Sequence, residues 1–404
     1  MEWKEVRLGD VCDLIAGFAF KAKDFGEFPT KVIKIGDIKP PFVDYVGQVG
    51  VDISNYDINR LSKYTVKYGD YVLAMTGATI GKVGKYISKN FSYINQRVLK
   101  FSPKQNVDAD YINYIICSNI FAKYVVNYVD SESAQPNISA PTISKFAFQI
   151  PSEKGDQHRI ASILSSLDRK IELNNKINAD LEEMAQAIFK NWFVDFEPFK
   201  DGKFVDSELG MIPEGWKVGT LTEIASYMNG LAMQKYPPEN IEDSLPVLKI
   251  KELGQGFCGT DSDRCSCNIK DECKIHNGDV IFSWSGTLLV DVWCGGDCGL
   301  NQHLFKVTSN DYPKWFYYYW TKYHLQEFIH IAKDKAVTMG HIKRGHLEEA
   351  LVAIPDNDSM EKAHELFEPI LSKMISLRLE NSRLSLLRDT LLPRLMSGEL
   401  EVPE

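Results

Sequence analysis

The sequence predicts an α+β chain in which two mostly-β globular halves with short helices are separated by two long antiparallel coiled-coil helices. Three observations support this fold class: an internal repeat, short β-rich runs inside each copy, and a long amphipathic segment ending each copy. We expect the two copies to be related by an approximate two-fold axis.

The repeat begins with the same Trp-Lys pair in both copies. Trp3-Lys4 recurs as Trp216-Lys217, which is 213 positions later. Further blocks recur in the same order: Gly17-Phe18-Ala19 with Gly230-Leu231-Ala232, Val32-Ile33-Lys34-Ile35 with Val247-Leu248-Lys249-Ile250, Gly69-Asp70 with Gly278-Asp279, Thr76-Gly77 with Ser285-Gly286, Asn95-Gln96 with Asn301-Gln302, and Ile150-Pro151 with Ile354-Pro355. A conserved order of blocks indicates one structural unit used twice.

Local composition predicts mostly β heads with some helix. The β-branched and aromatic runs Tyr71–Met75 and Val280–Trp284, bounded by Gly and polar residues, are typical of strands. Dense apolar and aromatic residues at Ala109–Tyr124 and Pro313–Ile331 favour a shorter helix in each head.

Each copy ends in a long amphipathic helix. Apolar residues recur at three- and four-residue steps at Ile160, Leu164, Leu167, Ile171, Leu181, Ala185 and Ile188, and again at Ile370, Met374, Leu377, Leu384, Leu391 and Leu395. Asn174, Asn178 and Asn381 fall in these apolar seams, where buried polar side chains fix register at some cost in stability.

Four segments follow from this pattern: a head at 1–155, a helix at 156–200, a second head at 201–357 and a second helix at 358–404. Antiparallel pairing would place the heads at opposite ends, on the order of 50 Å apart for about 35 helical residues. That span is about one to one and a half turns of B-DNA. Two unlike heads at a fixed spacing suit a duplex with two unlike half-sites, whereas a scaffold with two protein-binding heads would share the architecture.

Composition sets wide limits. The 404 residues are 44% hydrophobic and 25% charged, as in ordinary soluble domains. No run approaches the roughly 18 apolar residues that span a bilayer, and the N-terminus lacks a signal-peptide pattern, so we expect a cytoplasmic protein. The net charge of −9 neither requires nor excludes nucleic acid, because Lys and Arg can be concentrated on one face.

Neither the cysteine spacing nor a search for known catalytic motifs supports a metal site or an enzymatic activity. The cysteines between Cys258 and Cys298 lack the paired C-x2-C spacing of common zinc sites, so free thiols are favoured over zinc and no metal ligand is predicted. There is no phosphate loop, no H-E-x-x-H, no G-x-S-x-G and no Asn-Pro-Pro-Tyr type of methyltransferase motif.

Several longer stretches point to a family. They are Gly77-Ala78-Thr79-Ile80-Gly81, Gln135-Pro136-Asn137-Ile138-Ser139, Gln157-His158-Arg159-Ile160-Ala161, Ile171 to Asn178, Met184 to Phe196, Asp206 to Trp216, Phe282-Ser283-Trp284-Ser285-Gly286, and Leu391 to Gly398. Together they span nearly the whole chain, and in this order the sequence resembles the specificity subunits of type I restriction-modification systems.

The resemblance implies a subunit with no catalysis of its own, and the missing motifs disfavour a fused restriction-methylation enzyme. Two target recognition domains, at 1–155 and 201–357, would each read one half of a split, asymmetric DNA site. The long helices would set the spacer and dock two methyltransferase subunits, and two restriction/translocase subunits would join the full complex. S-adenosylmethionine, ATP and magnesium would belong to those partners and not to this chain.

The repeat separates scaffold from candidate readers. Side chains shared by two heads that read different sequences cannot discriminate between bases, so Gly69-Asp70, Asn95-Gln96 and their repeats are predicted to be scaffold. The candidate DNA-binding residues lie where the heads diverge: Lys21, Lys23, Lys82, Lys85, Arg97, Gln135 and Asn137 in the first head, and Gln234, Lys235, Lys335, Thr338, His341, Lys343 and Arg344 in the second. Arg and Lys favour guanine edges or phosphates, and Asn and Gln favour adenine. A solvated surface role is the alternative for each of them.

Partner docking is predicted on the helix faces near Phe189, Trp192 and Phe193. The alternative for these aromatic residues is to cap the end of the coiled coil.

Overall fold

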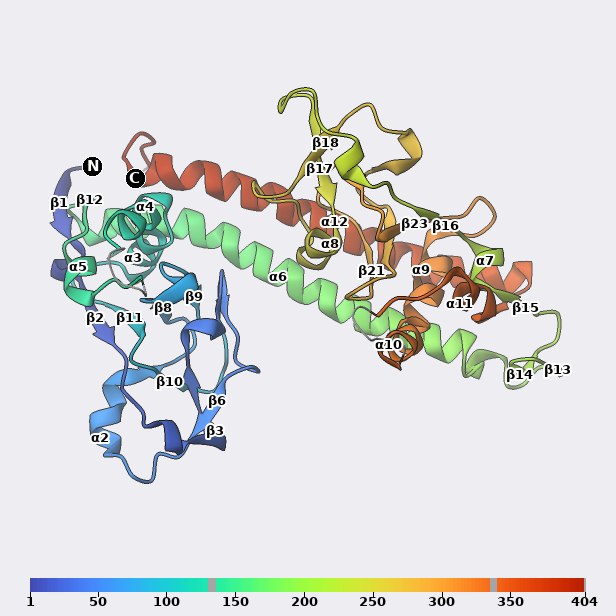
Figure 1. Cartoon of the computed structure of the whole chain (residues 1–404), viewed down its shortest axis with the longest axis horizontal. Helices are drawn as coiled ribbons and strands as arrows, with labels where there is room; N and C mark the ends of the chain where they lie inside the picture. Colours follow the sequence, from blue (N-terminus) through green and yellow to red (C-terminus); the bar gives the residue numbers. More distant parts are fainter. Residues whose placement is uncertain (130–135, 335–339, 403–404) are drawn as a thin grey trace. The chain divides into compact units, whose positions relative to one another are not determined.

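The computed structural model describes residues 1–129, 136–334 and 340–402. The chain forms two compact units, Met1–Arg169 with Ser385–Glu404, and Lys170–Leu384. Each unit holds one head with part of both long helices, α6 (Lys154–Phe193) and α12 (Asn357–Met396) (Figure 1). The α+β fold class with two long helices is confirmed, although the compact units group the four predicted segments differently.

The larger sheet of the first unit has six strands in the order β2-β11-β8-β9-β5-β4. Its strands are β2 (Cys12–Ala16), β4 (Ile38–Lys39), β5 (Phe42–Val43), β8 (Tyr71–Ala74), β9 (Val83–Lys85) and β11 (Val98–Pro103). One face of this sheet places Leu73, Leu99 and Phe101 in the main core of the unit. The strand predicted at Tyr71–Met75 is thus present as β8.

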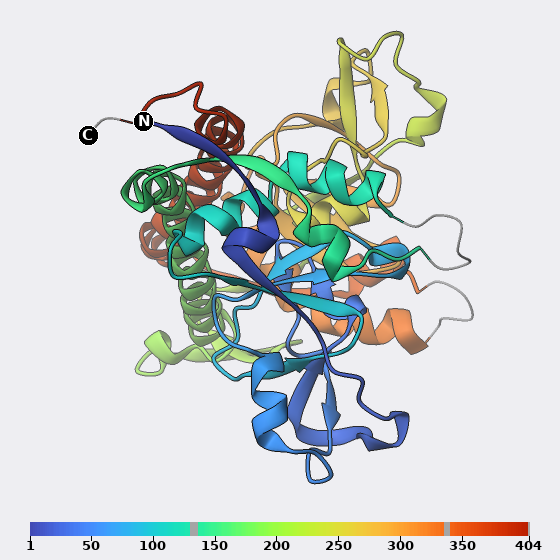
Figure 2. The ribbon, with the colours of Figure 1, turned by 90° about the vertical axis from the view of Figure 1, so that its left-hand side faces the viewer.

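A smaller sheet of the same unit has the order β6-β3-β10-β7. It consists of β3 (Phe25–Ile33), β6 (Val49–Val51), β7 (Thr65–Val66) and β10 (Ser92–Ile94), with the short helix α2 (Ile58–Leu61) and 3-10 turns at Ala22–Asp24, Ile35–Asp37, Ser62–Tyr64 and Gly77–Thr79 nearby. Val32, Leu61 and Tyr93 form a separate small core here. Figures 1 and 2 show this blue lobe on one side of the larger sheet.

Helices complete the first unit. Strands β1 (Trp3–Arg7) and β12 (Ala147–Pro151) pair antiparallel, and the short helices are α1 (Leu8–Val11), α3 (Ala109–Ile116), α4 (Asn119–Asn127) and α5 (Ala140–Ser144). The single helix predicted at Ala109–Tyr124 is therefore wrong in detail. It is divided because the Ser118 hydroxyl accepts a hydrogen bond from the Phe121 N–H at 3.3 Å and caps a new helix, α4.

The two long helices are antiparallel within the first unit. Ile160 and Leu164 of α6 share a core with Leu395 of α12. Further along α6, Asp168 is paired with Arg388 at 2.8 Å. Residue numbers rise along α6 while they fall along α12, as the sequence predicts.

The second unit repeats most of these elements. Two four-stranded sheets have the orders β16-β23-β20-β21 and β18-β17-β22-β19. The strands are β13 (Phe204–Ser207), β14 (Gly210–Pro213), β15 (Lys217–Thr220), β16 (Ser226–Asn229), β17 (Ser244–Leu248), β18 (Arg264–Ser266), β19 (Lys274–Ile275), β20 (Val280–Ser283), β21 (Leu289–Val292), β22 (Cys298–Leu300), β23 (Leu304–Thr308) and β24 (Leu351–Ile354). The short helices are α7 (Leu221–Ile224), α8 (Ile250–Gln255), α9 (Lys314–Tyr323), α10 (Leu325–Asp334) and α11 (Arg344–Glu349), with 3-10 turns at Glu197–Phe199, Met233–Lys235 and Asp271–Cys273. The predicted helix at Pro313–Ile331 is again two helices, separated at His324.

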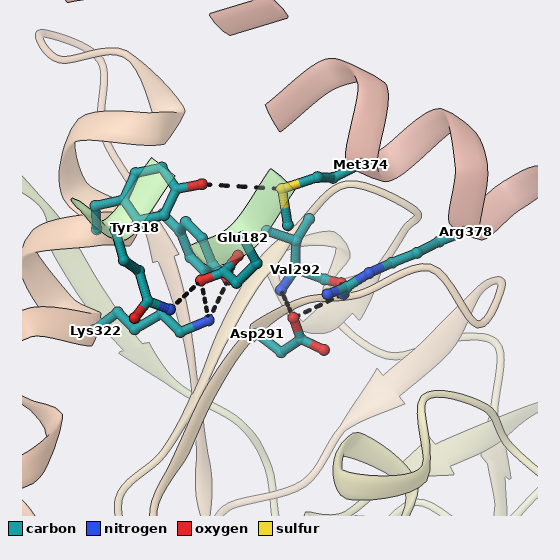
Figure 3. A network of polar contacts seen from close by, with 9 residues as sticks. Glu182, Asp291, Val292, Tyr318, Lys322, Met374 and Arg378 are labelled. Atoms are coloured by element: carbon teal, nitrogen blue, oxygen red, sulfur yellow. Dashed lines mark hydrogen bonds and ion pairs between the residues drawn. The ribbon is translucent and has the colours of Figure 1, made fainter. Parts of the chain in front are cut away.

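Polar contacts join both long helices to the head within the second unit. Figure 3 shows Lys322 of α9 beside Glu182 of α6, with Nζ and Oε1 2.5 Å apart. Arg378 of α12 lies 2.7 Å from the Asp291 carboxylate of β21 and donates to the Val292 carbonyl at 3.0 Å. These contacts fix α6 and α12 to the same head.

Candidate nucleic-acid interface

A three-residue turn joins the two sheets of the first unit. We call Asn95-Gln96-Arg97 the first junction turn, because β10 of the smaller sheet ends at Ile94 and β11 of the larger sheet begins at Val98. Phe18 forms an isolated parallel bridge with Asn95. A Cβ atom on Gly17 would lie 2.2 Å from the Asn95 carbonyl oxygen, so only glycine allows this approach.

The second unit builds the same junction. The second junction turn, Asn301-Gln302-His303, lies between β22 and β23, and Leu231 forms the parallel bridge with Asn301. A Cβ atom on Gly230 would lie 2.2 Å from the Leu300 carbonyl oxygen. The repeated glycine thus serves the same close approach in both heads.

A third segment meets the first junction turn. The Met75 N–H donates to the Arg97 carbonyl at 2.9 Å, and the Ile138 N–H donates to the Met75 carbonyl at 2.9 Å. Thr76 and Asn137 form an antiparallel bridge beside these contacts. The exposed side chains of Arg97 and Asn137 are therefore held on either side of one strand end.

The equivalent segment of the second unit makes equivalent contacts. The Trp284 N–H donates to the His303 carbonyl at 3.4 Å, and the Ile342 N–H donates to the Trp284 carbonyl at 3.1 Å. Ser285 bridges with His341. His341 is thus the structural counterpart of Asn137, and His303 that of Arg97.

The Gly-Asp blocks, which were predicted to be scaffold, form matching turns and ion pairs in the two heads. Gly69 and Gly278 adopt φ of 91° and 92°, in the left-handed region that favours glycine. The next residue of each block, Asp70 or Asp279, forms an ion pair with a lysine of the neighbouring strand, Lys100 at 2.7 Å or Lys306 at 2.8 Å. These matched contacts show that Gly69-Asp70 and Gly278-Asp279 support the fold in both heads.

A buried aromatic residue supports the Gly-Asp turn of the first unit. The Gly69 N–H donates to the Tyr86 carbonyl at 2.8 Å. Burial raises the pKa of Tyr86, so its hydroxyl remains neutral and can donate to the Asn90 carbonyl at 2.7 Å.

The structure gathers only part of the predicted reader set. Lys82 is exposed. It lies next to the first junction turn, because its carbonyl accepts from the N–H of Ala74, the residue before Met75, at 3.0 Å. Lys85 pairs with Tyr71 at the other end of β9, away from the turn. The remaining described candidates are exposed: Lys21 and Lys23 just after the Phe18 bridge, Gln234 and Lys235 just after the Leu231 bridge, and Lys343 and Arg344 just after His341. Gln135, Lys335 and Thr338 lie outside the described residues.

His303 is a candidate that sequence reasoning missed. Its ring is exposed and lies 5.9 Å from the Trp284 ring, centroid to centroid. The signal was present in the residue that follows each Asn-Gln pair, which is Arg97 in the first head and His303 in the second.

The predicted docking role of Phe189 and Phe193 needs correction. Their side chains are 3% and 1% exposed, and both belong to the core of the second unit. Phe193 packs against Trp216 at 5.7 Å, and Phe189 against Trp320 at 5.1 Å, measured between ring centroids. They are buried because the C-terminal end of α6 packs against the core of the second head. Trp192 is only partly buried, so it alone of the three remains a docking candidate.

The cysteines are free thiols. Within residues 1–129, 136–334 and 340–402, no group of three or more His, Cys, Asp or Glu side chains is placed to hold a metal ion. In the same residues, no helix has the length and apolar character needed to cross a membrane.

Comparison with known proteins agrees with this architecture. Residues 1–183 and 213–381 match the family model of the type I restriction modification DNA specificity domain. The chain is 31% identical over 349 residues to the type I restriction enzyme MjaIX specificity subunit of Methanocaldococcus jannaschii, covering 82% of this chain and 78% of that protein. It is 24% identical over 473 residues to the type I restriction enzyme HindI specificity subunit of Haemophilus influenzae, covering 99% and 100%.

A solved structure supports the fold. The crystal structure of the type I restriction-modification S subunit from M. genitalium is similar with a TM-score of 0.53 and 14% identity, covering 98% of this chain and 96% of that one. The matched family model and the relatives show that this chain belongs to the type I restriction-modification DNA specificity family.

Proposed function

We propose that this chain is the DNA-recognition subunit of a type I restriction-modification complex and that each of its two heads reads one half of a split, asymmetric site. The chain is a specificity subunit and not itself a catalyst. The observation that best supports two half-sites is the pair of junction turns, which share a backbone arrangement and differ in their exposed side chains.

The long helices are proposed to set the spacer between the half-sites. Each is a single 40-residue helix, and α6 and α12 are antiparallel within each unit. Inserting one heptad into both helices should lengthen the spacer by about 10 Å, or roughly three base pairs. An unchanged spacer in the methylated sites would argue against this role.

The partners are proposed from the same family membership. Two methyltransferase subunits would dock on exposed helix faces such as that of Trp192, and two restriction/translocase subunits would join the complete complex. S-adenosylmethionine, ATP and magnesium would be bound by those subunits.

Binding of duplex DNA by the full chain, alone and assembled with its methyltransferase partner, tests the proposal. We expect sequence-selective binding in the assembled complex, and mapping methylated adenines in the source genome by single-molecule sequencing should identify two unlike half-sites. An assembled complex without sequence selectivity would falsify the proposal and favour a protein scaffold.

A further inference from the structure

We propose that the third residue of each junction turn discriminates between bases: Arg97 in the first head and His303 in the second. The inference rests on the proposed function, because it assumes that each head contacts one half-site. It deepens that function by assigning specificity to one structural position that carries two different side chains.

The backbones of the two turns are held by matching hydrogen bonds. The N–H of the first turn residue donates to the end of an earlier strand, Asn95 to Ile33 of β3 at 3.0 Å and Asn301 to Leu248 of β17 at 3.1 Å. The carbonyl of the same residue accepts from the first residue of the following strand, from Val98 of β11 at 2.8 Å and from Leu304 of β23 at 3.0 Å. The side chains of Arg97 and His303 are therefore attached at equivalent backbone positions.

The rest of the turn cannot distinguish the half-sites. Asn and Gln occupy the first two positions in both heads, so any base contacts that they make would be shared. The third side chain is exposed in both heads. In the part of the chain that the structure describes, no ion pair or hydrogen bond occupies the Arg97 guanidinium.

Arg97 has the chemistry of a guanine reader. Its planar guanidinium offers parallel N–H donors, which match the O6 and N7 acceptors at the major-groove edge of guanine. A phosphate contact would use the same charge without any dependence on sequence. The two roles are therefore separable by changing the shape of the side chain while keeping its charge.

His303 offers a different and smaller donor pattern. Its Nε2 lies 3.3 Å from the Gln302 amide nitrogen, and its ring is tilted by 46° against Trp284. If the amide donates, Nε2 is the acceptor and the proton is on Nδ1. One N–H donor can contact one acceptor, so the second head should select its base by a single hydrogen bond where the first uses two.

A reciprocal exchange in the full chain, assembled with its methyltransferase partner, tests the assignment. Arg97→His and His303→Arg complexes would each select from a duplex library with a randomised segment, and the selected DNA would be sequenced. We expect each variant to change the preferred base at one position of one half-site, with about a tenfold or greater loss on the original site. The other half-site should keep its sequence.

Two further variants distinguish base recognition from a charge contact that does not depend on sequence. Arg97→Lys keeps the charge but loses the planar fork, so we expect relaxed base preference with little change in affinity for unrelated DNA. Lys123→His removes an exposed charge on α4 of the same unit, outside the junction turn, and should alter neither.

The outcomes are distinct. A uniform loss of affinity for all sequences in Arg97→His, or unchanged base preference in both exchange variants, overturns the inference while the proposed function stands. A wild-type complex that selects no sequence overturns the proposed function instead. Melting temperatures of the exposed-site variants should equal that of the wild type, so a change in selectivity cannot be assigned to unfolding.

Discussion

Asn174 of α6 donates from Nδ2 to the side-chain oxygen of Asn381 in α12 at 2.9 Å. The same nitrogen donates to Glu380 at 2.8 Å, and Asn381 donates to Asn175 at 2.8 Å. Asn174 is fully buried, and its own Oδ1 has no partner among the described residues. A buried amide bonded across the seam opposes slippage of one helix along the other, because a shifted register would break these bonds.

Replacing Asn174 with alanine should therefore lower the free energy of unfolding by about 1 to 3 kcal/mol, since the Asn381 oxygen loses its donor inside the helix pair. Urea unfolding followed by circular dichroism measures the change. Lys176→Ala, at an exposed position of the same helix, should stay within about 0.5 kcal/mol of the wild type.

The pairing of Asn174 with Asn381 predicts a non-additive double variant. Asn174→Ala combined with Asn381→Ala should cost less than the sum of the two single changes, because both remove the same hydrogen bond. Strict additivity, or an Asn174→Ala variant as stable as Lys176→Ala, would contradict a role for this pair in the seam.

The seam shows what could be predicted from sequence. Helical periodicity and repeated blocks can be recognised in the sequence alone. They therefore predicted the long helices, the duplication and the polar seam positions of Asn174 and Asn381. The approach of Gly17 to Asn95 was not, because it joins two sheets through backbone atoms and leaves no mark in residue spacing.

The site was less accessible for two physical reasons. His303 directly follows a pair of residues that the two heads share, so the similarity of the blocks drew attention away from it. Phe189 and Phe193 lie on an apolar helix face, and periodicity cannot tell a docking face from one that is covered by a head that follows in the chain.

Alkaline pH should destabilise the second unit. Burial, with a smaller contribution from Asp279, raises the pKa of Tyr317 to about 12. Below the ordinary tyrosine pKa of about 10 both states are neutral, but between about pH 10 and 12 only the unfolded state ionises. The stability from the buried, neutral Tyr317 is thus complete below pH 10 and is lost as pH rises towards 12.

Tyr317→Phe should reduce that pH dependence by about 1 to 3 kcal/mol over this range. Thermal melting between pH 9 and 12 would be followed for the variant and for Tyr323→Phe, whose side chain is 46% exposed. We expect the Tyr323→Phe curve to follow the wild type. Parallel curves for Tyr317→Phe and wild type would show that this hydroxyl does not contribute.

Metal removal should leave the fold unchanged. The cysteines are free thiols, and no cluster of three possible metal ligands occurs among the described residues. We expect the same melting temperature with and without a chelator, and well under one zinc ion per chain by elemental analysis. Stoichiometric zinc together with a fall in melting temperature on chelation would restore the zinc hypothesis.

The junction turn itself can be tested at its glycine. Gly17→Ala would place a methyl group 2.2 Å from the Asn95 carbonyl oxygen, so the turn must shift or the strands must separate. Overpacking of this kind costs about 1 to 3 kcal/mol. We expect a lower melting temperature and weaker discrimination at one half-site, because Arg97 follows the displaced turn.

Gly36→Ala is the matched control, since a Cβ atom there would have no neighbour within 4 Å. Both variants would be assembled with the methyltransferase partner and compared on the selected DNA site and on sites altered in either half. Gly230→Ala should affect the opposite half-site, because Gly230 supports the second turn in the same way. If Gly17→Ala weakened binding equally on every sequence, the junction turn would be a general DNA contact, and the discriminating residues would have to lie elsewhere in the head.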